Sequence, residues 1–343
     1  MSEDLLFVQT NNPAGNQVLI CGVAADGAIE VVETVDTDGD GGAHDGLTFD
    51  PLDSQGSLVY DRRHRLLFAV NADSNTISVL GGSRPHPHLR QVVPSGGVFP
   101  VSIAVHNDLL YVLNAHAGGS ITGYRIAGTQ LHAIEDSTRS LELAPASGPG
   151  QNVVSPAQLA FSPDGSELVV ATKAAGGGLL DVFAIGADGR PSEEFTANEA
   201  GTPAPFGFTF DGYGRLAVTD AILGVLSTYT LRHGKTQKVA SEPDGKAAMC
   251  WIAEANGNFY VTDAGSDTIS CYHVDEDGRP RVLNQTATGS FPIDMAVTRD
   301  ERFLYVQLAA AHRIQGYRVE DDATLTAVAT LDVPTSAQGI AVN

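Results

Sequence analysis

Two carboxylates occupy identical sequence contexts. Asp220 and Asp263 each follow an apolar stretch within the tetrapeptide Val-Thr-Asp-Ala. A carboxyl group at the edge of a buried strand has its pKa raised by burial and can serve as a general base or acid. The alternative is that each side chain caps a turn by accepting hydrogen bonds from nearby backbone N–H groups. Both residues are therefore candidate catalytic residues, and turn capping stays open for each.

Two histidines and two cations could complement these carboxylates. His116 and His312 follow similar apolar stretches, and an imidazole can transfer protons near neutral pH, although a solvated loop histidine is the alternative. Lys173 and Arg139 could anchor an anionic substrate or stabilise a lactone oxyanion. An isolated cation in an acidic protein could instead serve only in an ion pair.

Further polar and aromatic side chains are candidates for substrate binding. Asn71 and Asn114 each follow a strand-like segment and could instead cap their own loops, so both substrate binding and capping stay open for them. The sole tryptophan is expected to form a pocket wall rather than to react. The substrate-binding candidates of this kind are Asn71, Asn114, Gln55, Gln158, Phe206, Trp251 and Gln338.

One segment resembles part of a calcium-binding loop. Asp36, Asp38 and Asp40 precede a glycine in the pattern Asp-x-Asp-x-Asp-Gly, but the twelfth position, which needs a bidentate glutamate, is Leu47. A flexible Asp/Gly loop is the alternative. The sequence contains no Gly-x-Ser-x-Gly, His-Glu-x-x-His, P-loop or dinucleotide motif. We therefore expect neither a metal nor a cofactor.

The charge of the chain excludes some classes of partner. The 343 residues carry a net charge of −21 and include only four lysines, so phosphate backbones and anionic membranes would repel the protein. No apolar run approaches the roughly 20 residues of a membrane-spanning helix, and the N-terminus lacks a secretory pattern. The three cysteines form no paired motif. These features predict a soluble cytoplasmic monomer that acts on a small molecule and binds neither nucleic acid nor membrane.

Internal repeats indicate how the candidate residues are positioned. Seven short apolar segments read alike, and their starts are 43 to 56 residues apart. Turns and further strand-like segments follow each of the first six, and no helical periodicity is present. The seven segments are Ser-Gln-Gly-Ser-Leu-Val-Tyr from residue 54, Phe-Pro-Val-Ser-Ile-Ala-Val from 99, Ser-Pro-Ala-Gln-Leu-Ala-Phe from 155, Ala-Pro-Phe-Gly-Phe-Thr-Phe from 204, Ala-Met-Cys-Trp-Ile-Ala from 248, Phe-Pro-Ile-Asp-Met-Ala-Val from 291 and Ser-Ala-Gln-Gly-Ile-Ala-Val from 336.

The repeats predict a seven-bladed β-propeller with four antiparallel strands per blade. The first unit begins with a second-strand sequence, and the chain ends on an unpaired first-strand sequence at residues 339–342. The C-terminal strand should therefore complete the N-terminal blade and close the ring. This arrangement predicts one domain over residues 1–343 and leaves no exposed sheet edge between the first and last units.

The repeat motifs carry a resemblance to a known family. The Ser-Pro-Asp-Gly turn at residues 162–165, the strand Leu-Leu-Tyr-Val-Leu-Asn at 109–114 and the strands Thr-Ile-Ser-Val at 76–79 and Ser-Ile-Thr-Gly-Tyr at 120–124 are similar to those of lactonase-type propellers. That family includes proteins like 6-phosphogluconolactonase and the carboxymuconate-cyclizing enzymes. The resemblance covers residues 5–342. It implies an enzyme that opens a small lactone ring, or a cyclase or isomerase that runs the reverse cyclization.

Propellers bind ligands at the mouth of the central channel, where the candidate residues should gather. Long loops at residues 36–53 and 138–154 should partly cover this face. The family pattern has a Pro-His pair opening a first strand and several arginines at the mouth, whereas no histidine follows Pro100, Pro156, Pro205 or Pro292 here. A mouth with few basic residues disfavours a phosphorylated substrate. The alternative function is a non-catalytic propeller that binds a small molecule or a protein on the same face.

Overall fold

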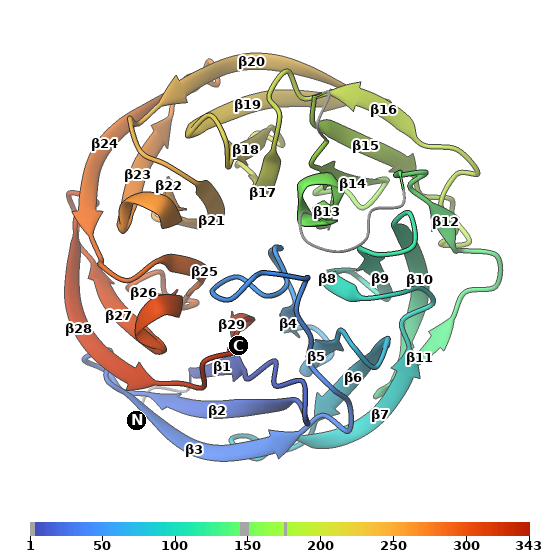
Figure 1. Ribbon diagram of the computed structural model, residues 1–343, viewed down its shortest axis with the longest axis horizontal. Coiled ribbons are helices and arrows are strands. Elements are labelled where there is room, and N and C mark those ends of the chain that lie inside the picture. Colours follow the sequence, from blue (N-terminus) through green and yellow to red (C-terminus); the bar gives the residue numbers. More distant parts are fainter. Residues whose placement is uncertain (1–3, 145–150, 175–176) are drawn as a thin grey trace.

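Seven antiparallel sheets are arranged as blades around a common centre (Figure 1). The computed structural model describes residues 4–144, 151–174 and 177–343. Within each blade the strands follow one another in chain order from the centre outward, except that the innermost strand of the first blade comes from the C-terminal end of the chain. The structure thus confirms the predicted all-β fold with seven blades and four antiparallel strands per blade.

The first four blades are bounded as follows. Blade 1 contains β29 (Ile340–Val342), β1 (Leu5–Gln9), β2 (Gln17–Val23) and β3 (Ile29–Asp36). Blade 2 contains β4 (Leu58–Asp61), β5 (Leu66–Asn71), β6 (Thr76–Gly81) and β7 (His88–Pro94). Blade 3 contains β8 (Pro100–His106), β9 (Leu109–Asn114), β10 (Ser120–Ala127) and β11 (Gln130–Ala133), and the short β12 (Arg139–Ser140) also pairs with β10. Blade 4 contains β13 (Pro156–Phe161), β14 (Glu167–Thr172), β15 (Leu179–Ala184) and β16 (Thr196–Glu199).

The remaining blades follow the same plan. Blade 5 contains β17 (Pro205–Phe210), β18 (Leu216–Asp220), β19 (Val225–Arg232) and β20 (Lys235–Pro243). Blade 6 contains β21 (Met249–Ala255), β22 (Asn258–Asp263), β23 (Thr268–Val274) and β24 (Pro280–Ala287). Blade 7 contains β25 (Pro292–Val297), β26 (Phe303–Leu308), β27 (Arg313–Val319) and β28 (Leu325–Asp332). Short 3-10 turns are η1 (Gln151–Val154), η2 (Ala264–Ser266) and η3 (Ala309–Ala311). In the described ranges no helix has the length and apolar character needed to cross a membrane.

The burial of the strands follows their place in the blade. Every residue of the second strands β5 and β26 is buried, because both faces of these strands pack against neighbouring blades. Their sequences are accordingly near-continuous apolar runs. The outermost strands β3 and β20 instead alternate between exposed and partly buried residues, since one face meets solvent. The core therefore lies between the blades rather than at the centre of the ring.

Tyrosines of several second strands join neighbouring blades. The hydroxyl groups donate hydrogen bonds to backbone carbonyls in the turn between the third and fourth strands of the next blade. These bonds run from Tyr111 to Gly189 (2.7 Å), from Tyr260 to Ala323 (3.1 Å) and from Tyr305 to Gly27 (2.9 Å). Each phenol thus buries its ring between two blades and still satisfies its polar atom. The repeated contact fixes one blade relative to the next.

The innermost strands begin with a bulge in five of the blades. In β8, β13, β17, β21 and β25 the register with the second strand shifts directly after the first paired residue. A bulge leaves a residue outside the ladder and turns its side chain in a new direction. Phe206, Trp251 and Asp294 lie in these bulges. The start of each innermost strand therefore supplies side chains to one end of the ring.

The ring closes as the sequence predicts. Strand β29 pairs antiparallel with β1, with Leu6 opposite Val342 and Val8 opposite Ile340. The Gln9 amide also donates a hydrogen bond to the Gly339 carbonyl (2.9 Å). Gly339 has a φ of +112°, and a β-carbon there would lie 2.7 Å from Ser57 Oγ and 3.0 Å from Gln9 Cβ. Only glycine fits the approach of this last strand to its neighbours.

This contact generates a stability prediction. Gly339→Ala should lower the free energy of unfolding by about 2–4 kcal/mol, because it combines an unfavourable φ with steric overlap in the closing strand. Gly128→Ala is the matched control, since Gly128 also has a positive φ (+62°) but has no atom within 4 Å of the added carbon. The control should lose no more than about 1–2 kcal/mol. Urea unfolding followed by Trp251 fluorescence measures both, and equal losses would contradict the steric account.

Candidate functional site

The loop between β3 and β4 crosses the centre of the ring at the end where the innermost strands begin (Figure 1). We call residues 44–55 the central loop. The indole nitrogen of Trp251 donates a hydrogen bond to the Ser54 carbonyl (2.9 Å), and the Gln55 amide group forms two bonds of 3.0 Å with the backbone of Ile252. The Leu52 amide donates to Gln338 Oε1 (2.7 Å). These contacts with blades 6 and 1 hold the loop over the mouth, as its length predicts.

Lys173 lies beneath the central loop. It directly follows β14, and only 5% of the residue is exposed. Its ammonium group donates hydrogen bonds to the carboxylate of Asp53 and to the Asp53 carbonyl (3.1 Å), and lies 4.9 Å from the centre of the Phe206 ring. A buried ammonium group needs a counter-charge, which Asp53 supplies. The aromatic face adds a favourable cation–π contact.

A second carboxyl group lies next to this ion pair. Asp50 Oδ1 accepts hydrogen bonds from the Gln338 side-chain amide (2.7 Å) and from the Asp53 backbone N–H (3.0 Å). Burial raises the pKa of Asp50 well above its usual range, and the charge of Asp53 adds to the rise while that of Lys173 opposes it. Burial also raises the pKa of Asp53, against the effect of Lys173. Because two adjacent carboxylates cannot both ionise readily, Asp50 holds the proton and Asp53 stays ionised beside Lys173.

A pair of histidines lies at the side of the same mouth. His116 Nε2 and His44 Nδ1 are 3.1 Å apart, and the His116 ring stacks on Phe99 with ring centres 4.1 Å apart. Phe99 is held at a φ of +62°, an unfavourable conformation for a bulky residue. Burial, followed by the charge of Lys173, lowers the pKa of His44 to about 3. Burial also lowers the pKa of His116, with Asp45 opposing the shift. Both imidazoles are therefore neutral near pH 7.

Comparison with known proteins agrees with this architecture. The family model described as lactonase, 7-bladed beta-propeller, matches residues 18–338. The chain belongs to this lactonase family. No curated protein sequence matches the chain.

Solved structures share the fold at low sequence identity. One is described as a putative 6-phosphogluconolactonase from Bacteroides fragilis, with 15% identity, a TM-score of 0.77, and coverage of 100% of this chain and 98% of that chain. A periplasmic gluconolactonase from Pseudomonas aeruginosa has 15% identity, a TM-score of 0.76, and coverage of 99% and 98%. Virginiamycin B lyase from Staphylococcus aureus has 12% identity, a TM-score of 0.56, and coverage of 84% and 87%. At these identities the likeness shows the fold alone.

Several residues predicted from the sequence meet at the mouth of this lactonase-family propeller. Lys173 and Gln338 contact the central loop directly, and Gln55 belongs to it and bonds Ile252 and Ser102. Phe206 and Trp251 pack edge to face with ring centres 4.8 Å apart and form an apolar floor beneath Lys173. His116 lies at the side of the site with His44. Sequence reasoning missed His44, Asp50 and Asp53, although their position in an unusually long loop was a signal for function.

Other predicted residues instead stabilise backbone. The Asp220 carboxylate accepts hydrogen bonds from the backbone amides of Ala204 (2.7 Å), Ile222 (3.0 Å) and Leu223 (2.6 Å), so this residue caps a turn and its prediction as a general base is corrected. The Gln158 side chain bonds the backbone N–H (2.6 Å) and carbonyl (3.0 Å) of Phe208 and joins blades 4 and 5.

The two asparagines also have structural partners. Asn71 accepts from Asn16 and Thr37 and donates to Thr76 and Ser78. Asn114 donates to the Ser95 carbonyl and the Ser120 hydroxyl, each at 3.4 Å. Asn71 therefore joins side chains of neighbouring segments and does not cap its own loop. The Oδ1 atom of Asn114 is buried and finds no partner among the described residues.

The predicted position of Arg139 near the mouth is wrong. Arg139 belongs to β12 at the periphery of blade 3 (Figure 1), where its guanidinium group donates to carbonyls. Those acceptors are the carbonyls of Ser192, Pro191, Asp136 and Thr138. His312 follows η3 with a φ of +52°, and within the described ranges its side chain forms no hydrogen bond or ring contact with the other candidates. The second long loop, at residues 138–154, includes residues 145–150, which lie outside the described residues.

The weak calcium candidate does not form a cluster. Asp36, Asp38 and Asp40 are all exposed, and Asp36 accepts a hydrogen bond from Gln17 (2.6 Å). The described part of the chain contains no group of three or more His, Cys, Asp or Glu side chains that could hold a metal ion. Asp36 ends β3, and Asp38 and Asp40 lie in the solvated loop that follows it.

Asp263 has an unusual environment outside the central loop. Its carboxyl group is fully buried and accepts a hydrogen bond from the Ser270 hydroxyl (2.7 Å). Burial, followed by the charge of Asp244, raises the pKa of Asp263 to about 8, and Lys246 opposes this shift. Its other oxygen has no hydrogen-bond partner within the described ranges. The group is thus a protonated acid near pH 7 rather than a base.

This environment predicts a pH-dependent stability difference. The folded-state pKa of Asp263 (about 8) lies above the ordinary value of 3.8, so the folded state holds a proton that the unfolded chain releases between these values. Its contribution to stability is full below about pH 4 and falls by up to about 1.4 kcal/mol per pH unit until pH 8. Asp263→Asn removes this titration. The variant should gain thermal stability relative to wild type as pH rises from 5.5 to 8.5.

The control makes the same charge change on an exposed turn, as Asp277→Asn. Its stability relative to wild type should be nearly independent of pH. Unfolding midpoints of the three proteins at both pH values measure the effect. A constant difference between Asp263→Asn and wild type across this range would contradict the raised pKa.

Proposed function

We propose that this protein is a lactone hydrolase whose acid–base centre is Asp50, Asp53 and Lys173. The observation that carries the proposal is the pair of adjacent carboxyl groups in the central loop, one with a strongly raised pKa and one bonded to a buried ammonium group. Asp50 is partly exposed, whereas Asp53 and Lys173 are buried. The protonated acid is thus the member of the centre that meets solvent. Membership of the lactonase family supports this reaction class.

The pair can supply both proton transfers of lactone hydrolysis. Water attacks the lactone carbonyl and forms the new C–O bond, while the ionised carboxylate accepts a proton from that water. The ring C–O bond then breaks, and the protonated Asp50 donates its proton to the departing ring oxygen. The product is a hydroxy acid, and the centre has exchanged one proton for another. Lys173 keeps Asp53 ionised before the water attacks, and a proton must pass from Asp53 back to Asp50 before the next cycle.

The surroundings fit a small neutral or singly charged lactone. Phe206 and Trp251 give the centre an apolar floor, and the stacked rings of His116 and Phe99 line its side. His44 and His116 are neutral, so the only cation that contacts the acid pair in the described residues is Lys173, which Asp53 already neutralises. A doubly charged phosphate would lack a counter-charge at this mouth.

The test is hydrolysis of a panel of five- and six-membered lactones, some phosphorylated, followed by acid release and corrected for hydrolysis in buffer alone. Asp50→Asn should reduce kcat by at least about 10²-fold, because the amide cannot donate the proton. Lys173→Met should reduce it similarly. The wild-type rate should fall as pH rises through the raised pKa of Asp50, since the proton donor is then lost.

Asp220→Asn is the matched control, because it alters a buried carboxylate that bonds only backbone amides. It should lower the unfolding midpoint but keep the wild-type kcat at a permissive temperature. Wild-type activity in Asp50→Asn would overturn the assigned acid. Binding of a lactone without turnover in the wild type would overturn catalysis and support a binding propeller instead.

A further inference from the structure

The innermost strands end on the face opposite the central loop, and arginines gather there. Arg62 follows β4, Arg299 lies two residues beyond β25, and Asn343 follows β29, so three consecutive blades contribute from adjacent strand ends. Arg65 lies in the same β4–β5 turn as Arg62, and Arg84 lies in the turn between β6 and β7. These five residues and Asp4 line one cavity of about 640 Å³.

The charge in this cavity is opposite to that of the protein as a whole. Four guanidinium groups line it, and Asp4 is the only acidic side chain among the described residues that line it, in a chain of net charge −21. Within the described residues, no carboxylate lies at ion-pair distance from Arg62, Arg65 or Arg299. Gathered like charges repel one another and attract an anion.

The acids around the cavity do not cancel this charge. Burial and Asp300 raise the pKa of Asp4, while Arg62, Arg84 and Arg299 lower it. Asp300 itself pairs with Arg302 (3.7 Å). The neighbouring Arg63 likewise pairs with Asp108 (3.3 Å) and donates to Asn107 (2.7 Å). Arg63 and Arg302, at the border of the cavity, therefore have acidic partners. Among the described residues, no carboxylate pairs in this way with Arg62, Arg65 or Arg299, which line it.

An independent observation points to the same ligand chemistry. Asn343 is 3% exposed, and its Oδ1 accepts a hydrogen bond from the Leu5 amide (2.8 Å). Its Nδ2 is buried and has no hydrogen-bond partner in the described part of the chain. A buried N–H donor without an acceptor is costly, and an oxyanion in the cavity would supply the acceptor.

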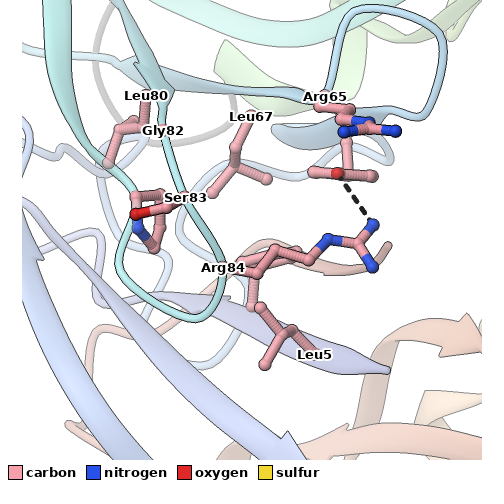
Figure 2. A pocket seen from close by; sticks show the side chains of 10 residues that line it. Leu5, Arg65, Leu67, Leu80, Gly82, Ser83 and Arg84 are labelled. Atoms are coloured by element: carbon pink, nitrogen blue, oxygen red, sulfur yellow. Dashed lines mark hydrogen bonds between the residues drawn. The ribbon is translucent and has the colours of Figure 1, made fainter. Parts of the chain in front are cut away.

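An apolar pocket adjoins the arginine cavity (Figure 2). It has a volume of about 230 Å³ and is lined by Leu5, Tyr60, Leu67 and Leu80 among others. Arg65 and Arg84 line both spaces, and Arg84 donates a hydrogen bond to the Tyr60 hydroxyl (3.1 Å). A ligand held by these arginines would therefore have room for an apolar group next to its charge.

We propose that this face is a binding site for a small organic phosphate: a dianionic phosphate held by Arg62, Arg65, Arg84 and Arg299, with an apolar group beside Leu67 and Leu80. Guanidinium groups suit phosphate because they donate parallel hydrogen bonds to two of its oxygens. The site lies at the other end of the ring from the acid pair. It does not depend on the lactonase proposal.

Calorimetric titration at fixed ionic strength tests the site with two probes, inorganic phosphate and phenyl phosphate. Wild type should bind phenyl phosphate at least about tenfold more tightly than inorganic phosphate, because the ring enters the apolar pocket. Arg62→Gln combined with Arg299→Gln should weaken phenyl phosphate binding by at least about tenfold. The Tm of the variant shows that it folds.

The matched control combines Arg63→Gln with Arg302→Gln, which removes the same charge from neighbouring turns. It should change the affinity by less than about twofold. Equal weakening in both variants would show a diffuse electrostatic effect and overturn the site. Equal affinity for the two probes would overturn the role of the apolar pocket. If neither probe binds, the phosphate site is overturned, and the arginines serve only as counter-charges for Asp4.

Discussion

The channel mouth is organised around one buried ammonium group. Lys173 loses its hydration when the central loop covers it, and an unpaired buried cation would cost several kcal/mol. Asp53 can supply the counter-charge only if the central loop lies close enough for the Asp53 carboxylate to contact Lys173 Nζ. The same loop position brings Asp50 beside Gln338 and Ser54 beside Trp251. The need to pair this charge therefore favours the loop position in which Asp50 and Ser54 also make their contacts.

That pairing also separates the protonation states of the neighbouring groups. Asp53 is ionised because it contacts Lys173. Asp50 lies beside this negative charge, and burial also raises its pKa, so Asp50 retains its proton. The positive charge further keeps His44 neutral. One lysine thus produces a carboxylate, a carboxylic acid and a neutral imidazole within one small region. Differences of this kind between adjacent titratable groups are typical of acid–base sites.

The sequence predicts the fold better than the site, for physical reasons. The apolar second strands and the unpaired segment at residues 339–342 determine seven blades and their closure, because each blade must bury both faces. Strand ends also place Lys173, Phe206 and Trp251 at one mouth. The periodic pattern of apolar residues does not determine the position of a long loop, so the sequence did not predict that Asp50 and Asp53 lie at the mouth. Nor can it distinguish Asp220, which bonds three backbone amides, from Asp263, which is buried beside another acid.

The two ends of the ring show that net charge is a poor guide to the ligand of this protein. An excess of 21 negative charges opposes the approach of a large anionic partner, although solvent ions weaken this repulsion beyond about 10 Å. A small ligand senses only the groups that line its cavity. Turns at the ends of the innermost strands differ freely between blades, because the core lies between the blades and does not restrain them. One face can therefore hold an acid pair while the opposite face gathers arginines from blades 2 and 7.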